Sequence, residues 1–538
     1  MRRAKERKGD GPKMSLLDRA ISYFSPQLML KRVAAQNMLS MFGYGEGSFG
    51  AYNGGRRQRS GTERWNPMAG DPDTDLLWDL PWLRKRSEDL ARNNPIAASA
   101  LNNNESNVVG TGLRLNARVN AKRLGWSDDQ AKEFNEQAEF GFQLFGKRCD
   151  FYGRQPFEGL QRLTLRSTLT RGDVVALLPY KKRRGDAFGT KIQLIEADRL
   201  SNPGWKADSE KLVQGVALDD DGAPIGYHIS NKHPGSITNP KGFSWTYYPE
   251  YSASGHRNVI HSFDPRRPGQ HRGIPYLSPI IEKLKQLDRY TDAEIMAAVV
   301  AGCFTVFVEN EAGESLKEMS PLADKEAATD KDSDDYRIEP GLIMDMQPGD
   351  RISTANPGRP NSAFDPFMNA ILMQIGAALD IPFEQLIKHF KASYSAARAA
   401  LLEAWRSYML RRRWLVDTFC TPVYEAWFSE AVASGYLVAP GFHRDPFLRA
   451  AYLGAEWIGP GPGQIDPTKE VQAAVMRMEN KLSTHAEECA ALTGQDWDKK
   501  VPIFHQEKAA LEGLSPAPPP VPTTDPEPNP NPDIEEAA

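Results

Sequence analysis

The sequence predicts a mixed α/β protein with several domains. Its 538 residues correspond to about three or four domains, at roughly 150 residues each. Helical spacing of apolar residues recurs in long stretches, whereas other stretches alternate between apolar and polar residues as half-buried strands do. A third observation is the turn sequence Asp219–Gly222, which lies between two alternating stretches and favours a β-hairpin. Helices and antiparallel strands are therefore expected in the same protein.

The first half of the chain predicts an arm followed by helices and strands. Residues 1–75 are rich in Arg, Gly and Asn and predict an arm without a core of its own. Helices are predicted over 75–92, 96–109, 128–145 and 157–170. Strands are predicted over 113–118, 173–180, 191–196, 213–218, 225–229 and 258–263. The helix over 128–145 has one apolar face, made of Phe134, Ala138, Phe142 and Phe145.

The second half predicts longer helices around an acidic insert. The helices are expected over 277–301, 363–379, 395–435, 468–482 and 483–492, with a kink at Pro422. The insert Glu309–Asp335 has ten acidic residues and three lysines, too few apolar residues for a core, and lies between β-like residues at 304–309 and 351–354. Ser483 and Thr484 offer N-cap chemistry to the last helix. The segment Pro516–Pro532 has nine prolines and is expected to be disordered.

The charge balance excludes one class of DNA-binding protein. The chain has 66 Lys and Arg residues against 70 Asp and Glu residues, a net charge of −4. Tight, nonspecific DNA binding depends on an excess of positive charge. Any contact with nucleic acid must therefore be local.

The cysteines and the best candidate for a membrane span predict a soluble protein of a reducing compartment. Cys149, Cys303, Cys420 and Cys489 lie far apart without metal-binding spacing, so we expect buried thiols rather than disulfides or a zinc site. The basic N-terminus is not followed by the long apolar segment of a secretory signal. The uncharged run Ile295–Val308 has 14 residues, whereas a membrane-spanning helix needs about 20. We expect a cytosolic location and no membrane partner.

Two glycine-containing strings mimic nucleotide-binding motifs but lack the required chemistry. Gly45–Gly50 matches G-x-G-x-x-G, but no strand precedes it and no helix opens after it. Gly141–Lys147 mimics most of a phosphate-binding loop, but Arg148 stands where a Ser or Thr hydroxyl should bind magnesium. Calcium binding by the aspartates at 219–221 is an alternative to a simple turn, although the bidentate Glu of an EF-hand is missing. We therefore predict no catalysis, no cofactor and no metal.

Cations are clustered in a Pro- and Gly-rich loop before the helix over 277–301. They are Arg266, Arg267 and Arg272. Loop solubility explains them as well as contact with a neighbouring subunit or with DNA does, so both interpretations stay open.

A second group of cations lies between the helices over 363–379 and 395–435. Asp380 and Pro382 end the first of these helices, and Lys388, His389 and Lys391 follow in a polar loop. Taken alone, these three residues are exposed polar residues of an ordinary helix connection.

Four separated motifs, in order along the chain, resemble the portal proteins of lambda-type tailed phages. They are Gly110-Thr-Gly112, Gly273-Ile-Pro-Tyr-Leu-Ser-Pro279, Ala392-Ser-Tyr-Ser-Ala-Ala-Arg398 with Trp405, and Gly461-Pro-Gly-Gln-Ile-Asp-Pro467 with Lys469-Glu470. The resemblance covers residues 78–496. The acidic insert has no motif that can be aligned, and the proline-rich tail is not diagnostic.

The resemblance implies a portal fold assembled as a ring, with an α/β wing, a helical stem, a small α/β clip and a helical crown. In this chain it would place an N-terminal arm at 1–75, the wing at 76–276, stem helices at 277–301 and 362–379, the clip at 302–361, the tunnel loop at 380–394, a long kinked helix and the second part of the wing at 395–466, the crown at 467–512 and a disordered Pro-rich tail at 513–538. Lys388, His389 and Lys391 would then face a DNA channel.

The resemblance also implies a structural role without catalysis. The chain would form a homododecamer at one capsid vertex, through which double-stranded DNA is packaged and ejected. Its partners would be other copies of itself, the major capsid or scaffold protein, the large terminase subunit, head-tail adaptor proteins and transiently bound, nonspecific DNA. It would be found in the virion, and in the host cytoplasm during assembly.

Two alternatives belong to other classes. One is another capsid-associated connector or minor head protein, which an isolated monomer or a ring of different symmetry would favour. The other is a DNA-processing enzyme, which ATP hydrolysis or magnesium-dependent nicking by the purified chain would favour.

Overall fold

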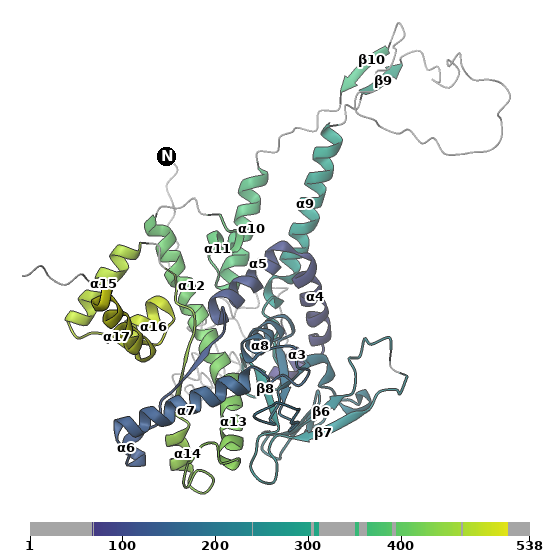
Figure 1. Ribbon diagram of the computed structural model, residues 1–538. Coiled ribbons are helices and arrows are strands. Elements are labelled where there is room, and N and C mark those ends of the chain that lie inside the picture. Colours follow the sequence, from purple (N-terminus) through teal and green to yellow (C-terminus); the bar gives the residue numbers. More distant parts are fainter. Residues whose placement is uncertain are drawn as a thin grey trace, which may run out of the picture. The chain divides into compact units, whose positions relative to one another are not determined.

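The computed structural model describes Pro67 and residues 69–238, 240–302, 306–310, 350–354, 363–389, 394–463 and 466–514. The chain divides into two compact units, Met1–Gly70 and Asp71–Ala538. The elements below belong to the second unit (Figure 1). Helices and strands occur together there, as the sequence predicts. Most of the predicted arm, residues 311–335 of the acidic insert and the proline-rich tail lie outside the described residues.

The predicted helices of the first half are present, except that the one predicted over 75–92 is divided at Trp78 and Asp79 into two helices. They are α3 (Pro72–Leu77), α4 (Leu80–Asn93), α5 (Pro95–Asn104), α7 (Asp128–Gly146) and α8 (Phe157–Arg171), with a short α6 (Ala121–Leu124) before α7. Side-chain caps explain several starts: Asn94 accepts the N–H of Ala97 at 2.8 Å, and Ser127 forms a capping box with Gln130. A π-helical turn, η2 (Glu105–Val109), continues α5 as far as Gly110.

A three-stranded antiparallel sheet lies at the centre of the first half. Its order is β3-β2-β8, with β2 at Asp173–Leu177, β3 at Gln193–Glu196 and β8 at Val259–Phe263. All five residues of β2 are buried. The predicted strands over 173–180, 191–196 and 258–263 are therefore confirmed, with shorter bounds.

A second antiparallel sheet has its strands in sequence order. They are β4 (Leu212–Val213), β5 (Val216–Leu218), β6 (Pro224–Ser230) and β7 (Trp245–Pro249). The predicted single strand over 213–218 is wrong, because Gln214 and Gly215 form a turn with φ of 44° and 89° that divides it. The predicted hairpin turn is confirmed: the carboxylate of Asp219 accepts the N–H groups of Asp221 and Ala223.

The long helix predicted over 395–435 is one continuous run of three parts. These are α12 (Tyr394–Leu415), a π-helical turn η7 (Val416–Cys420) and α13 (Thr421–Ala433). Pro422 lies in the first turn of α13, directly after the π-helical turn. The irregularity predicted at Pro422 is therefore a local change in helical winding, which accommodates a residue that lacks a backbone N–H.

Aromatic rings fill the core between α7 and α13. Trp427 is completely buried and meets Phe142 and Phe188 edge-on at centroid distances of 5.3 and 5.4 Å. Phe142 also meets Tyr424 edge-on at 5.5 Å. The apolar face predicted for α7 is confirmed, since Phe134, Ala138, Phe142 and Phe145 are all buried.

Two neighbouring helices, α9 (Ile281–Gly302) and α10 (Phe364–Leu379), pack along each other (Figure 1). Tyr290 of α9 stacks on Phe364 at 5.6 Å and meets Phe367 edge-on at 5.1 Å. The short helix η5 (Ser278–Ile280) precedes α9. Strands β9 (Val306–Asn310) and β10 (Asp350–Thr354) form an antiparallel pair, as the β-like residues around the acidic insert predict.

The C-terminal part contains a two-stranded sheet and three helices. Strand β11 (Ala455–Ile458) follows α14 (Pro446–Tyr452) and pairs with β1 (Arg114–Ala117). The helices are α15 (Pro467–Glu479), α16 (His485–Thr493) and α17 (Trp497–Leu514). The predicted N-cap is confirmed, because Thr484 and Glu487 form a capping box. The sequence does not predict α17, whose interior Pro502 interrupts the helical pattern.

The cysteines are only partly as expected. Cys149 and Cys420 are buried, but Cys489 is partly exposed, and Cys303 lies outside the described residues. Cys489 lies in α16, a helix in which Glu488 is the one fully buried residue among those described. Within the part of the chain that the structure describes, none of the helices combines the length and the apolar character that a membrane span requires.

A buried carboxylate, Asp173 at the start of β2, collects donors from distant parts of the chain. It accepts hydrogen bonds from Arg84 of α4 at 2.7 Å and from Arg272 at 2.6 Å, and it lies 3.2 Å from the imidazole of His261 of β8. Both carboxylate and Arg272 guanidinium are completely excluded from solvent. The cluster therefore joins α4, β2, β8 and the loop before η5.

The same guanidinium of Arg272 also satisfies backbone carbonyls. It donates to the oxygens of Leu200, Gln214 and Ala197 at 2.9, 2.7 and 2.7 Å. Burial by itself would raise the pKa of Asp173, but the charges of Arg272 and Arg84 outweigh it and hold that pKa well below its usual range. The guanidinium groups of this cluster therefore donate to partners within the fold.

Asp173→Asn is expected to destabilise the chain strongly. The substitution leaves the guanidinium groups of Arg84 and Arg272 buried without a counter-charge, a loss of roughly 3–5 kcal/mol. Thermal unfolding followed by circular dichroism should show a clear drop in melting temperature. The matched control is Asp220→Asn, which removes an exposed pair with Lys211 and should change stability by less than about 0.5 kcal/mol. Equal melting temperatures for the two variants would contradict this account.

The stability of the fold should also fall on mild acidification through His261. Burial lowers the pKa of His261 in the folded chain, so the unfolded chain binds a proton that the folded chain does not. Stability is therefore lost as the pH falls below the unfolded pKa of about 6.5. Melting temperatures measured from pH 7.5 to 5.0 should decline, and the decline should be smaller in His261→Gln. An identical pH dependence in both proteins would show that His261 does not contribute.

Candidate channel loop and the cluster that anchors it

Of the ten described residues that follow α10, 380–389, five form a short helix. Helix α10 ends at Asp380, and the short helix α11 (Phe383–Ile387) ends at Lys388. Asp380 and Lys388 both adopt left-handed backbone conformations, with φ of 53° and 55°. Their N–H groups close the two helices by donating to the carbonyls of Gly376 and Glu384. The polar loop predicted from the sequence is therefore half helix.

Polar side chains of α5 hold α11 by its backbone. Ser99 donates to the carbonyl of Leu386 at 2.7 Å, and Asn103 donates to that of Gln385 at 2.9 Å. On the other side, the hydroxyl of Tyr408 in α12 donates to the side chain of Gln385 at 2.9 Å. Ile381 and Leu386 are buried. The base of the segment is thus fastened to two long helices.

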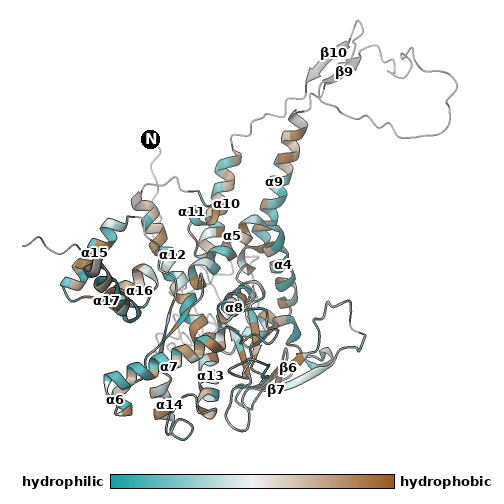
Figure 2. Cartoon of the chain, in the orientation of Figure 1, coloured by the Kyte–Doolittle hydropathy of each residue, from teal (hydrophilic) through white to brown (hydrophobic). Residues whose placement is uncertain are grey.

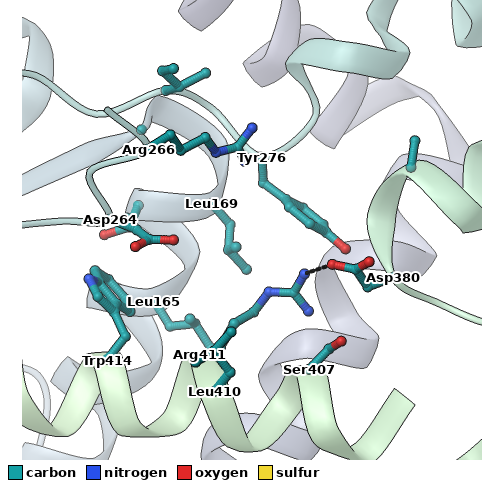
Figure 3. A pocket seen from close by; sticks show the side chains of 14 residues that line it. Leu165, Leu169, Asp264, Arg266, Tyr276, Asp380, Ser407, Leu410, Arg411 and Trp414 are labelled. Atoms are coloured by element: carbon teal, nitrogen blue, oxygen red, sulfur yellow. Dashed lines mark ion pairs between the residues drawn. The ribbon is translucent and has the colours of Figure 1, made fainter. Parts of the chain in front are cut away.

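Arg411 of α12 fastens the end of α10 (Figure 3). Its guanidinium donates to Asn104 at 3.0 Å and to the carbonyl of Leu379 at 3.3 Å, and it lies 3.5 Å from the carboxylate of Asp380. It also lies over the ring of Tyr276 at 4.8 Å. Burial raises the pKa of Tyr276, whose hydroxyl donates to the carbonyl of Leu379. Arg411 and Tyr276 therefore share one carbonyl and fix the exit from α10.

A cavity of about 410 Å³ lies beside this cluster. Figure 3 shows Arg266 and Asp264 on one side of it and Leu410, Arg411 and Trp414 on the other. Arg266 is exposed, and its backbone N–H donates to the side chain of Gln270 at 2.9 Å. Arg266 is therefore accessible to solvent. Both interpretations of this loop require that, loop solubility as well as contact with a neighbouring subunit or with DNA.

Of the predicted channel residues, Lys388 and His389 are exposed at the end of α11. Neither has an ion pair among the described residues. Lys391 lies outside the described residues. The end of α11 therefore exposes the side chains of Lys388 and His389, and contacts with α5 and α12 hold α11 in place.

The three loop arginines have different surroundings. Arg267 forms an ion pair with Asp75 at 2.7 Å, with both side chains about half exposed. Both interpretations are wrong for Arg272, the solvated loop residue as well as the contact with DNA or a neighbouring subunit, because its guanidinium is completely buried against Asp173. An arginine that satisfies a carboxylate and three carbonyls inside the fold is not available to an outside partner. The sequence does not separate the three, since all stand in one Pro- and Gly-rich stretch.

Sequence reasoning missed the residues that anchor the segment. Ser99, Asn103, Asn104 and Arg411 carry no motif. A usable signal was the run Asn102–Asn104 in an otherwise apolar helix, because amide side chains inside a packed protein need backbone partners. Among the described residues, no group of three or more His, Cys, Asp or Glu side chains could hold a metal ion.

The sequence matches the family described as "Phage portal protein, lambda family" over residues 58–412. It is 28% identical to portal protein B of Escherichia phage lambda over 481 residues, covering 85% of this chain and 89% of that protein. It is 28% identical over 482 residues to the portal protein of Escherichia phage N15, and 25% identical over 456 residues to a probable portal protein of Halomonas phage phiHAP-1.

Comparison with solved structures finds chains from the native gene transfer agent particle (TM-score 0.41, 12% identity) and from the neck of the empty particle (TM-score 0.42, 12% identity). They cover 77% and 76% of this chain, and 93% of each of those chains. Because the family match spans more than half of the chain, this protein belongs to the lambda family of phage portal proteins.

Proposed function

We propose that this chain forms the portal ring at one vertex of a capsid, and that double-stranded DNA is packaged and ejected through the ring. The family match supports this role. The structural observation that carries it is the apolar surface of α9, where Ile295, Met296 and Val299 are each more than half exposed (Figure 2). Apolar residues grouped on one side of a helix favour contact with another protein surface. In a cyclic ring, that surface belongs to the next copy of the chain.

The proposed parts of the ring follow the lambda-type arrangement. The wing would comprise residues 76–276 and 395–466, the stem α9 and α10, the clip residues 302–361 and the crown residues 467–512. The paired strands β9 and β10 fit a small α/β clip, and helices α15, α16 and α17 fit a helical crown. The ring would most simply be a dodecamer.

Residues 380–394 would form the tunnel loop. The contacts of α11 with α5 and α12 support this role, because they hold one end of the segment while leaving Lys388 and His389 exposed. Repeated around a ring, Lys388 and Lys391 would place cations close to the DNA backbone. Few cations per subunit suit a conduit, since every neutralised phosphate adds an attraction that translocation must break.

The proposed role is structural, without a catalytic step. The large terminase subunit and head-tail adaptor proteins would dock on the clip, and the capsid or scaffold protein would surround the wing. The ring would be part of the virion after assembly in the host cytoplasm.

Ile295→Asp is expected to weaken ring assembly. Burial of an isoleucine side chain contributes roughly 1.5–3 kcal/mol, and the substitution would place an unpaired carboxylate in an apolar interface. Native mass spectrometry and negative-stain microscopy should show rings for the unmodified chain at micromolar concentration and mainly smaller species for the variant.

The control for this assembly test is Ala293→Asp, which introduces the same charge at an exposed position on another side of α9. It should retain rings. An unmodified chain that stays monomeric would overturn the proposed function, whereas rings in both variants would only move the interface away from α9.

Replacing Lys388 and Lys391 by Glu is expected to reduce DNA packaging without affecting folding or assembly. Exposed loop substitutions change stability by only about 0.5 kcal/mol, whereas a ring of carboxylates in a confined channel repels a polyanion. Capsids carrying the double variant should assemble normally and contain less DNA, measured by nuclease-protected DNA per capsid. The control variant Lys182→Glu with Lys206→Glu reverses two exposed charges elsewhere. Equal packaging in both variants would remove the electrostatic role of the loop.

A further inference from the structure

Strand β11 has one edge without a strand partner. Among the described residues it pairs with β1 alone. The opposite edge of that sheet is partly closed by side chains: Ala117 donates its N–H to Glu139 at 2.9 Å, and Leu113 exchanges two hydrogen bonds with Gln161 at 2.8 and 3.0 Å. Side chains therefore occupy two of the three outward-directed positions of the β1 edge, those of Leu113 and Ala117 but not that of Leu115, whereas among the described residues none occupies the edge of β11.

The hydrogen-bond pattern shows which backbone groups face the available edge. The N–H of Arg118 donates to the carbonyl of Gly454 at 2.8 Å, in line with the antiparallel register of β1 and β11. Hydrogen-bonded pairs in an antiparallel ladder fall on every second residue. Ala455 and Trp457 therefore direct their N–H and C=O groups away from β1, and no hydrogen bond to them occurs within the described residues.

A groove of about 510 Å³ runs along this edge. The strand and the residues as far as Pro462 form one wall, Trp405 and Met409 of α12 and Val416 of η7 form the facing wall, and Ala490 and Ala491 of α16 line it as well. Arg412 also lines the groove. It donates to the carbonyls of Val108, Asn107 and Pro460, so its charge has no carboxylate partner among the described residues. The groove is mainly apolar, and two arginines, Arg412 and Arg413, and one carboxylate, Glu456, also line it.

The C-terminal sequence contains a segment with a matching repeat. From Asp525 to Pro532, every second residue is proline, and the residues between are Asp525, Glu527, Asn529 and Asn531. In an extended chain, alternate residues direct their backbone groups to opposite edges. Since proline has no N–H, all backbone donors of this repeat lie on one edge. Such a segment can pair with one strand and cannot continue the sheet, which suits an edge position.

We propose that the segment Asp525–Pro532 docks in this groove as an added strand on the open edge of β11. The backbone groups of Asp525, Glu527, Asn529 and Asn531 would pair with those directed outward by Ala455 and Trp457. Addition of an extended peptide to an open sheet edge is an established mode of recognition. It would also cover an edge that otherwise invites aggregation.

Charge and chain length agree with this occupant. Residues 515–538 contain five acidic residues and no basic one, and the groove is lined by two arginines, Arg412 and Arg413, against one carboxylate, Glu456. Helix α17 has 18 residues and can lead away from α16 by at most about 27 Å. The 11 residues 515–525 can return by up to about 36 Å. The docking requires no ring, so it stands apart from the proposed function.

Photo-crosslinking in the full chain tests the docking. With Met409 replaced by p-benzoylphenylalanine, irradiation should join this position to a peptide that contains residues 525–532, identified by mass spectrometry. The control replaces Leu410, the exposed next residue, which lines the separate cavity beside Arg411. It should give little of that product. A product with the N-terminal arm or with another segment of a second copy, or no product, would overturn the proposal.

Two paired variants of the tail test the strand geometry. Glu527→Pro with Asn529→Pro removes two groove-facing donors and should lower the crosslink yield by about tenfold. Pro528→Ala with Pro530→Ala keeps every one of these donors and should leave the yield near that of the unmodified tail. Both double variants should remain folded, as judged by circular dichroism, because neither changes a residue of the domain itself. Equal crosslink yields for the two would overturn strand pairing.

Discussion

The first half of this protein depends on one buried carboxylate. Asp173 stands at the start of the central strand β2 and receives charged donors from α4 and from the loop before η5. A buried arginine is tolerable only with its counter-charge and hydrogen bonds in place. Arg272 has both, and through its carbonyl partners it also fixes the turn that divides β4 from β5. The cluster therefore sets where the long helix α9 begins relative to both sheets.

Two groups of cations among the described residues differ in their surroundings. One group binds the protein's own backbone, and the other is exposed to outside partners. Arg272, Arg411 and Arg412 bind backbone carbonyls and position elements of the fold. Lys388 and Arg266 stay exposed. Guanidinium groups have five donors in a rigid fork, which suits them to buried junctions, whereas an ammonium on a flexible stem suits a solvated surface. The proposed channel contact accordingly involves a small number of side chains on a well-anchored base.

Two surfaces of the described chain expose groups that are normally buried in a protein core. Helix α9 exposes apolar residues, and β11 leaves an edge unpaired beside an apolar groove. Each has its own proposed occupant: another copy of the chain for α9, and the chain's own C-terminal segment for β11. Both proposals rest on the same physical constraint. Burying apolar surface against other apolar surface, and pairing backbone donors with acceptors, both stabilise the assembled state.

The sequence alone determined most of the element types, the family and the apolar face of α7, because local periodicity, capping residues and turn chemistry act over a few neighbouring positions. It also located the segment that carries Lys388 and His389. Tertiary structure alone decided that Arg272 is buried while Arg266 is exposed, that α11 is a helix fastened by Ser99 and Asn103, and that residues 213–218 form two strands. These outcomes depend on partners 13 to 287 positions away in the chain, and no local pattern encodes the distance between such partners.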